Sequence, residues 1–301
     1  MRILISGASG LVGTAVASAL RADGHEVIRF VRPRGTCSPG DVRWDPAAEF
    51  VDAEGMEGAE AIVHLAGAGI GDSRWSETRK KTLRESRVNS TRTLVEAVAR
   101  LRRKPRILLA ASAVGYYGDR GDDVLNESSS NGEGFLAALA RDWELESLRA
   151  QSIGLRVVLL RFGMILSAEG GVLPRMTTPF KLGLGGRLGN GRQWVAWIAL
   201  EDAIGVIRAA LVDDALSGPV NVVSPAPVRN AEFTQALAGA LHRPAIFSIP
   251  VFALRLAFGE MAMELLLASQ RVEPAALIEK RYAFRLPGLE DALRSMLTTE
   301  E

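Results

Sequence analysis

Three glycines near the start of the chain constrain its fold more than any other feature. The segment Gly7-Ala8-Ser9-Gly10-Leu11-Val12-Gly13 follows an apolar run, Arg2–Ser6, and opens a helical pattern, Leu11–Asp23. In such a unit the first glycine permits a tight turn, the second lets a pyrophosphate approach, and the third allows close helix–strand packing. The alternative is a tight turn without a ligand. We expect a dinucleotide site contacted by Gly7, Ser9, Gly10, Leu11, Val12 and Gly13.

Short β-rich runs alternate with longer helical patterns along the first two thirds of the chain. This alternation predicts βαβ units with right-handed crossovers, and therefore an α/β fold with a doubly wound parallel sheet. The expected strands are Arg2–Ser6, Glu26–Val31, Val42–Asp45, Ala61–Leu65, Arg106–Ala111 and Leu155–Arg161. The expected helices are Leu11–Asp23, Trp75–Leu101 and Phe135–Gln151.

The sequence becomes rich in glycine and loop-forming residues after Phe162. Closely spaced glycines interrupt the segment up to Trp197, and long ordered loops are usually functional. Further helices are expected at Asp202–Val212, from an N-cap at Asn230, within Val251–Gln270 and at Leu289–Leu297. We therefore expect a nucleotide-binding domain, residues 1–163, to which residues 199–223 return, and a smaller α+β substrate domain, mainly residues 164–301.

Composition argues against several other classes of protein. The 301 residues include 36 Lys and Arg against 35 Asp and Glu, a net charge of +1 without a basic stripe, so we expect no nucleic-acid partner. Cys37 is the single cysteine, and the three histidines show no ligand spacing, so we expect neither an intrachain disulfide nor a metal. No apolar run reaches the length of a membrane helix. Glycines interrupt the one stretch that resembles a signal peptide, so we expect a cytoplasmic protein.

The end of the second expected strand indicates which dinucleotide is bound. An NAD site places an Asp or Glu there to hold the ribose 2′-hydroxyl. This chain has Arg32 instead, with Arg34 two residues later. A guanidinium binds a 2′-phosphate through charge-assisted hydrogen bonds, and no carboxylate is present to repel the phosphate. The pattern favours NADP(H), and the alternative is that both arginines are solvated surface residues.

Two further segments are candidate cofactor contacts. Leu65, Ala66 and Gly67 lie at the end of the expected strand Ala61–Leu65, and small residues there let the adenosine half of a cofactor lie against the backbone. Arg87, on the long helical pattern, is placed to reach a cofactor phosphate or ribose. On pattern alone, a surface arginine on an amphipathic helix is an equal alternative for Arg87.

Proton-handling groups are scarce where the nicotinamide is expected. The segment after the fifth strand, residues 111–118, should lie at the carboxyl edge of the sheet. It carries Ser112, Tyr116 and Tyr117. A phenol without a nearby cation keeps a pKa of about 10 and is a poor base at neutral pH. Lys81 and Arg87 are candidates for that cation. The alternative role for Ser112, Tyr116 and Tyr117 is to line a substrate pocket.

With these residues in hand, the chain resembles an atypical extended short-chain dehydrogenase of the epimerase family, of the kind called sugar-nucleotide epimerase-like. The similarity runs almost end to end, through the segments Gly7–Gly13, His64–Gly67, Trp75, Ser86-Arg87, Ser112–Gly118, Asp142–Glu144, Gly183–Gly186, Gly189–Gly191, Trp197-Ile198, Asn230–Phe233, Arg243-Pro244 and Gly259–Ala262. The resemblance implies a Rossmann-like domain that binds NADP(H), with Arg32, Leu65, Ala66 and Arg87 as contacts. It also implies a smaller C-terminal domain over the substrate cleft.

The chain departs from that family's usual chemistry. Short-chain dehydrogenases use a Tyr as acid or base, with a Lys four residues later. Here Tyr116, Tyr117 and Tyr282 are followed at that spacing by Arg120, Gly121 and Leu286. Relatives usually show Trp-Ile-His where this chain has Trp197-Ile198-Ala199, so no role of that histidine carries over.

These observations leave three functions open. The first is an NADP(H)-binding oxidoreductase or epimerase-like enzyme of unknown substrate with a non-standard active site. The second is a catalytically inactive NADP(H)-binding regulatory protein, linked to cell division by the label of some family members. The third is an interaction module without a dinucleotide. A small-molecule substrate is the expected partner, and the chain is expected to be a monomer or a homodimer. The resemblance implies the second arrangement, because extended relatives often pair across a dimer through the helices that correspond to Trp75–Leu101 and Phe135–Gln151.

Overall fold

An eight-stranded sheet organises the first part of the fold. The computed structural model describes residues 1–33, 35 and 37–297, so Arg34 lies outside the described residues. The strand order is β13-β8-β6-β5-β1-β2-β3-β4. These strands are β1 (Arg2–Ser6), β2 (Glu26–Val31), β3 (Val42–Asp45), β4 (Phe50–Val51), β5 (Ala61–His64), β6 (Ile107–Ala113), β8 (Arg156–Phe162) and β13 (Gly218–Val222).

The order of the strands reverses between β1 and β5. From β1 the chain adds β2 and β3 in one direction and β5 and β6 in the other, with β1–β2, β1–β5, β2–β3 and β5–β6 all parallel. Ser6 pairs with His64, so both strands end at the same edge. In open α/β sheets, ligands bind at such a reversal point, outside the carboxyl ends of the strands.

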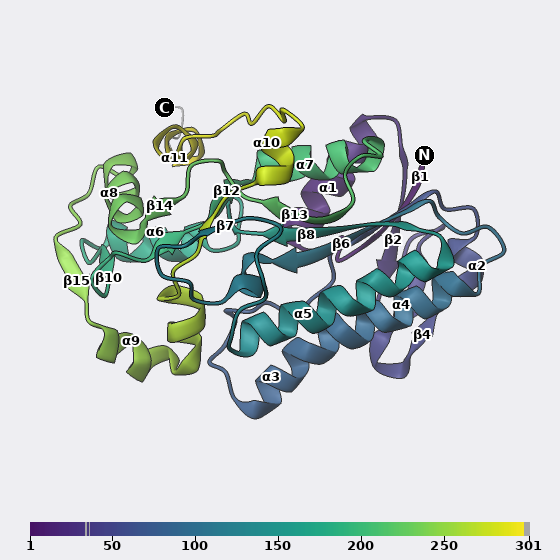
Figure 1. The fold of residues 1–301 in the computed structure, drawn as a ribbon, viewed down its shortest axis with the longest axis horizontal. Helices are drawn as coiled ribbons and strands as arrows, with labels where there is room; N and C mark the ends of the chain where they lie inside the picture. The colour runs from purple at the N-terminus through teal and green to yellow at the C-terminus, as the bar shows by residue number, and fades with distance from the viewer. Residues whose placement is uncertain (34, 36, 298–301) are drawn as a thin grey trace. The chain divides into compact units, whose positions relative to one another are not determined.

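Helices cover both faces of this sheet, as Figure 1 shows: α1 and α7 on one face, and α4 and α5 on the other. The α/β fold with a doubly wound parallel sheet is thereby confirmed. Apolar side chains of the strands and helices fill the layers between them, with Leu4, Phe30, Trp44, Leu94 and Leu108 almost completely buried. The helices are α1 (Leu11–Ala22), α2 (Ala53–Met56), α3 (Glu77–Arg84), α4 (Ser90–Ala99), α5 (Phe135–Leu148), α6 (Leu173–Lys181), α7 (Leu200–Val212), α8 (Asn230–Ala240), α9 (Val251–Phe258), α10 (Ala275–Glu279) and α11 (Leu289–Leu297).

The chain forms two compact units that are interleaved along the sequence. Unit 1 comprises Met1–Ser112, Leu139–Leu160 and Ile204–Val220. Unit 2 comprises Ala113–Ala138, Arg161–Ala203 and the chain from Asn221 onward. Residues 113–138 therefore group with unit 2, and the expected division near residue 163 stays a prediction about independently folding domains.

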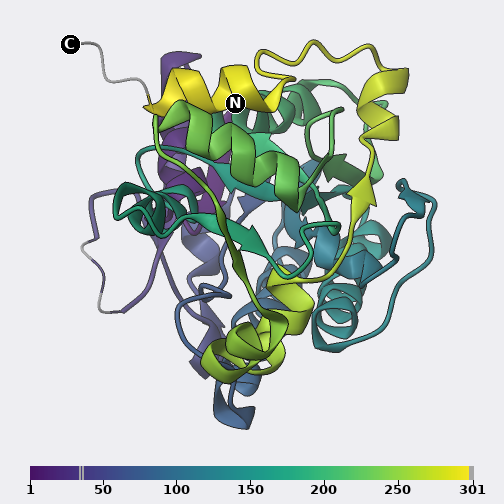
Figure 2. The same cartoon turned by 90° about the vertical axis from the view of Figure 1, so that its left-hand side faces the viewer.

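Unit 2 has its own apolar core and only short strands. In Figure 2, α11 lies along α8, and Leu237, Phe233 and Leu293 pack in a cluster with the fully buried Trp197. Two-stranded sheets pair β10 (Gly186–Leu188) with β15 (Phe247–Ile249), β11 (Trp194–Val195) with β14 (Val228–Arg229), β12 (Trp197–Ala199) with β9 (Met164–Leu166), and β16 (Arg271–Val272) with β7 (Val124–Leu125).

Three expected elements differ from the structure. The helix predicted over Trp75–Leu101 is α3 and α4 joined by a π-helical segment, Glu85–Asn89. Ser90 Oγ and Thr91 Oγ1 donate to the carbonyls of Ser86 and Arg87, each at 2.7 Å, which competes with regular helical bonding. Val251–Gln270 breaks at Gly259, which has φ +63°.

The third difference is at Asn230, where the prediction of an N-cap is wrong. Arg229 is the N-cap of α8, and Asn230 is the first residue of the helix. Asn230 Oδ1 instead accepts a hydrogen bond of 2.8 Å from the backbone N–H of Leu188, so it ties the helix to β10. The Glu232 side chain accepts from the Arg229 N–H at 2.8 Å and supplies the cap.

Both edges of the large sheet are short or blocked. The edge strand β4 has only two residues and pairs antiparallel with β3. At the opposite edge, β13 contains Pro219, which has no N–H, and the N–H of Asn221 donates to Glu127 Oε1 at 3.0 Å. No described helix is long and apolar enough to span a bilayer.

Candidate functional site

The glycine segment forms a close turn between β1 and α1. Gly7 has φ +71°, and a Cβ there would lie 2.8 Å from the carbonyl carbon and oxygen of Leu65. A Cβ on Gly13 would lie 2.1 Å from the Gly7 carbonyl oxygen. Gly10, the N-cap of α1, offers no capping side chain. Both the turn and the first turn of α1 are therefore shaped by the absence of side chains, and the helix start is left without a side-chain cap.

The remaining predicted contacts of this loop lie around the same turn. Ser9 is exposed, whereas Leu11 and Val12 are half-buried. Leu65 and Ala66 follow β5 and touch the position of Gly7 through their backbone atoms. Gly67 is exposed one residue further along. Unit 1 thus brings the glycine loop and the segment after β5 together, as the two adjacent parallel strands require.

A buried polar network supports this turn from below. The Ser6 hydroxyl accepts from the N–H groups of Leu65 and Ala66 at 3.1 and 3.3 Å, so its own hydrogen points to His64 Nδ1 at 2.7 Å. The other ring nitrogen, Nε2, then carries the proton and donates to Thr91 Oγ1 at 3.0 Å. Trp143 Nε1 donates to the same oxygen at 3.0 Å. Every member of this Ser6–His64–Thr91 network is satisfied with a neutral imidazole.

Burial holds the His64 ring in that neutral state. Its exposed fraction is 0%, and desolvation lowers its pKa from 6.5 to about 4. Thr91 Oγ1 passes its own hydrogen to the Arg87 carbonyl, which places the network in contact with the π-helical segment. His64 therefore has a positioning role beneath the loop.

Arg87 holds the loop after β5 in place. Its guanidinium donates to the carbonyls of Ala68 at 3.0 Å and Leu83 at 3.3 Å, and lies 5.3 Å from the centre of the Trp143 ring. Burial, with a smaller contribution from the charge of Arg79, lowers the pKa of Arg87 to about 10. No ion pair reaches Arg87 from the part of the chain that the structure describes. Contact with a cofactor phosphate or ribose stays a prediction for this residue.

Arg32 follows the last residue of β2 and is exposed. Its backbone carbonyl accepts from the Gly35 N–H at 2.8 Å, which turns the chain sharply after the strand. Within the described residues, its guanidinium has no hydrogen-bonding or ionic partner. It is therefore free to meet an anion at the edge of the sheet.

Ser112 is tied to a buried carboxylate. Its hydroxyl donates to Glu144 Oε1 at 2.6 Å, and the exposed fractions of the two residues are 3% and 5%. Glu144 comes from α5, and in the sequence only the family resemblance pointed to it. The hydrogen bond satisfies a buried side-chain oxygen of Glu144 and fixes the orientation of the Ser112 hydroxyl.

The two neighbouring tyrosines meet an arginine that the sequence analysis missed. In unit 2, the Arg161 guanidinium carbon lies 3.6 Å from the centre of the Tyr116 ring and 5.1 Å from that of Tyr117. Arg161 also donates to the Tyr117 hydroxyl at 2.9 Å, and that hydroxyl donates to Asn221 Oδ1 at 2.7 Å. The cation beside these phenols is thus Arg161, whereas Lys81 pairs with Glu85.

The two phenols differ in what they can do. Tyr117 is completely buried, and desolvation raises its pKa to about 12 although Arg161 opposes the shift. The Tyr117 hydroxyl therefore stays protonated and serves the packing of unit 2. Tyr116 is half-buried, and its hydroxyl has no hydrogen-bond partner among residues 1–33, 35 and 37–297.

Comparison with known proteins decides the family. A family model described as "NAD dependent epimerase/dehydratase family" matches residues 3–223, and "Domain of unknown function (DUF1731)" matches residues 249–296. The chain belongs to the NAD dependent epimerase/dehydratase family. An epimerase family protein of Mycobacterium bovis is 45% identical over 291 residues, 97% of this chain and 96% of the relative. Epimerase family protein SDR39U1 of Homo sapiens is 34% identical over 300 residues, 99% of this chain and 100% of the relative.

Solved structures of the epimerase family agree with this fold. Human epimerase family protein SDR39U1 (isoform 2), solved with NADPH, matches with a TM-score of 0.86 at 31% identity, covering 99% of each chain. A nucleoside-diphosphate sugar epimerase from Corynebacterium glutamicum matches with a TM-score of 0.82 at 38% identity, covering 99% of this chain and 58% of that one. The predicted resemblance to the epimerase family is confirmed.

No group of three or more His, Cys, Asp or Glu side chains that could hold a metal ion occurs among the described residues.

Proposed function

We propose that this epimerase family protein binds NADP(H) at the glycine loop of unit 1. The observation that carries the proposal is the closeness of Gly7 and Gly13, where a Cβ would lie 2.8 Å from Leu65 and 2.1 Å from the Gly7 carbonyl oxygen. Such a side-chain-free turn at the start of α1 fits a pyrophosphate, because the uncapped backbone N–H groups and the helix dipole favour an anion. The relative solved with NADPH supports the same assignment.

The residues around the loop fit the remaining parts of the cofactor. Arg32 would hold the 2′-phosphate that distinguishes NADP(H) from NAD(H), since no carboxylate ends β2. Leu65, Ala66 and Gly67 would line the adenosine half. Arg87 would support this segment through the Ala68 carbonyl, and it would also meet a ribose or phosphate. When bound, NADP(H) supplies a hydride donor or acceptor at its nicotinamide.

Replacing Arg32 with Ala tests this assignment. Loss of a charge-assisted hydrogen bond to the 2′-phosphate should weaken NADPH binding by about 2 kcal/mol, or roughly thirtyfold. NADH binding should be unchanged, because NADH has no such phosphate. Isothermal titration calorimetry with NADPH, NADP⁺, NADH and NAD⁺ measures the difference.

The control for this experiment is Arg100→Ala, which removes an exposed arginine at the end of α4. It should leave all four affinities unchanged. Equal weakening of NADPH and NADH in Arg32→Ala would contradict the assignment of the 2′-phosphate. Absence of binding by all four nucleotides to the wild-type protein would overturn the proposed function.

We further propose an oxidoreductase or epimerase-like activity in which Tyr116 handles the proton. Support comes from the Arg161 guanidinium, 3.6 Å from the ring centre, which holds the ring by a cation–π contact, and from a hydroxyl that no described residue engages. Tyr117 cannot take this part, because its hydroxyl is engaged by Arg161 and Asn221. Ser112, oriented by Glu144, would hydrogen-bond a carbonyl or hydroxyl of the substrate.

The two tyrosine hydroxyls should differ in their contribution to stability. Tyr117→Phe leaves Asn221 Oδ1 and one Arg161 N–H without their partner, so it should lower the free energy of unfolding by about 2 kcal/mol. Tyr116→Phe removes a hydroxyl without a protein partner and should cost less than about 0.5 kcal/mol. Urea denaturation measures both. A cost for Tyr116→Phe equal to that of Tyr117→Phe would mean that the Tyr116 hydroxyl is structural and not available to a substrate.

The second candidate is an NADP(H)-binding regulatory protein without turnover. It is favoured by the lack of a Lys four residues after any tyrosine, and by the raised pKa of Tyr117. Loss of reduced-nicotinamide absorbance with any carbonyl compound, including nucleotide-linked keto sugars, would exclude this candidate and support the enzyme.

A further inference from the structure

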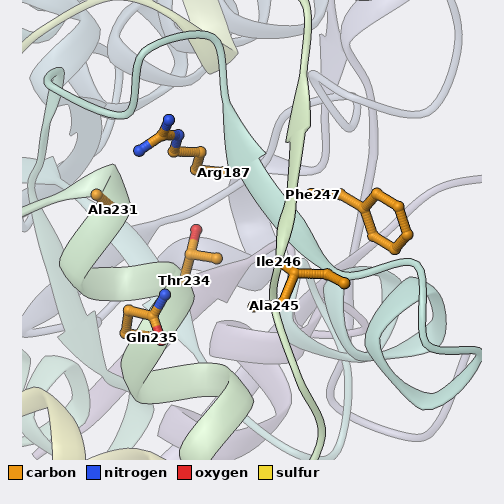
Figure 3. Close-up of a pocket in the computed structure, with 7 residues that line it drawn as sticks. All are labelled: Arg187, Ala231, Thr234, Gln235, Ala245, Ile246 and Phe247. Carbon is orange, nitrogen blue, oxygen red and sulfur yellow. The ribbon is translucent and has the colours of Figure 1, made fainter.

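Unit 2 contains a pocket that neither the cofactor nor the tyrosine assignments use. Its volume is about 390 Å³, and it lies where α8 faces the β10–β15 pair (Figure 3). Volumes of about 300–1,000 Å³ are typical of small-molecule sites. Three polar side chains and four apolar ones define its chemistry: Arg187, Thr234 and Gln235, with Ala231, Ala245, Ile246 and Phe247.

The polar side chains gather on one side of the pocket. In Figure 3, the Arg187 guanidinium extends toward Ala231 on α8, and the Thr234 hydroxyl points toward the same space, with the Gln235 amide beside it. Within the part of the chain that the structure describes, none of these three side chains has a hydrogen-bonding or ionic partner. Thr234 is nevertheless 96% buried, with an exposed fraction of 4%. A hydroxyl held in place by a buried residue, with no protein partner and beside an unpaired guanidinium, is suited to bind an external acceptor.

The opposite side of the pocket is apolar. Ile246 and Phe247 both line the pocket, with exposed fractions of 80% and 48%, and in Figure 3 their side chains extend to the same side of the segment. An aliphatic side chain so exposed gains when an apolar group of a ligand covers it. The pocket therefore combines one positive charge and two neutral donors with an apolar rim.

We propose that this pocket binds a small monocarboxylate with a short apolar chain. The planar guanidinium of Arg187 presents two parallel N–H groups that match the two oxygens of a carboxylate. Thr234 and Gln235 donate to the same oxygens, and the chain of the ligand covers Ile246. The lining contains a single cation and no acid, so a monoanion is neutralised, whereas a phosphate dianion keeps an unmatched charge.

Isothermal titration calorimetry with hexanoate tests the proposal, and three matched probes separate its parts. Acetate has the charge without the chain, 1-hexanol has the chain without the charge, and hexyl phosphate has a different anion. Hexanoate should bind saturably with one site per chain. The affinities of acetate and 1-hexanol should be lower than that of hexanoate by a factor of about ten or more. Absence of saturable hexanoate binding, or tighter binding of hexyl phosphate, would overturn the proposal.

Variants then place the bound carboxylate. Arg187→Gln should weaken hexanoate binding about tenfold or more, and Thr234→Val should weaken it by a smaller factor. The matched control is Arg192→Gln, an exposed arginine in the same segment that does not line the pocket, and it should bind as the wild type does. Arg187→Gln should keep the wild-type melting temperature and NADPH affinity, which separates this site from the proposed cofactor site. Equal hexanoate affinity in Arg187→Gln and wild type would refute the assignment.

Discussion

Gly13→Ala should lower the free energy of unfolding by about 3 kcal/mol, the upper range for forcing extra volume into a packed site. The added Cβ would lie 2.1 Å from the Gly7 carbonyl oxygen and 2.9 Å from Ala8 Cα, and both of these are backbone atoms. Backbone cannot rotate away as a flexible side chain does, so α1 has to shift from the loop. Urea denaturation gives the loss of stability, and the NADPH-induced shift in melting temperature should disappear.

Gly10→Ala is the matched control for this prediction. Its nearest contact would be the Gly7 oxygen at 3.3 Å, and its backbone is extended, with φ −83° and ψ 168°. We expect a stability within about 0.5 kcal/mol of the wild type, because an alanine fits this conformation. NADPH affinity should still fall, since a methyl group would occupy the space through which a pyrophosphate approaches. A stable Gly13→Ala with normal NADPH affinity would contradict the arrangement described for the loop.

His64 should make the stability of the protein depend on pH between about 6.5 and 4. Its pKa is about 4 in the folded protein, below the unfolded value of 6.5, so unfolding takes up a proton in this range. The stabilisation is complete above pH 6.5 and falls as the pH drops toward 4. The full loss amounts to about 3 kcal/mol, at about 1.4 kcal/mol per pH unit.

Urea denaturation at several pH values measures this loss. His64→Gln removes the titrating group. The slope of its free energy of unfolding against pH should therefore be smaller than that of the wild type, by at most the slope that one bound proton gives. His242→Gln, at an exposed histidine, is the control and should keep the slope of the wild type. Identical slopes for His64→Gln and wild type would show that the imidazole is not held neutral by burial.

The sequence predicts the local elements of this fold better than its polar networks. The bounds of β1, β2 and β3 match the expected strands, because short β-rich apolar runs between turn residues are typical of strands in a buried parallel sheet. Helical periodicity also marks α1, α4 and α5. It does not reveal the π-helical segment Glu85–Asn89, because the side-chain bonds of Ser90 and Thr91 to the backbone carry no signal in the hydrophobic pattern.

The candidate site depends on contacts between residues far apart in the sequence, and these contacts could not be predicted from the sequence. Gly7 and Gly13 were identified because their roles are local to one turn. Arg161, by contrast, lies 44 residues after Tyr117, and nothing in its spacing indicates that it covers the ring of Tyr116. His64 bonds to Ser6 on β1 and to Thr91 on α4, and Trp143 on α5 donates to the same Thr91 oxygen, so the network joins three separate elements to β5. Such contacts are set by the packing of the sheet and helices, which no single segment encodes.

The blunt edges of the large sheet limit how copies of this protein can associate. An exposed strand with free N–H and C=O groups recruits a strand from another chain, which leads to continuous intermolecular sheets and aggregation. Here β4 offers only two residues, and β13 offers Pro219 and an Asn221 N–H that is already bonded to Glu127. Growth of the large sheet across a subunit boundary is therefore disfavoured at both ends, and copies of the protein would associate through other surfaces.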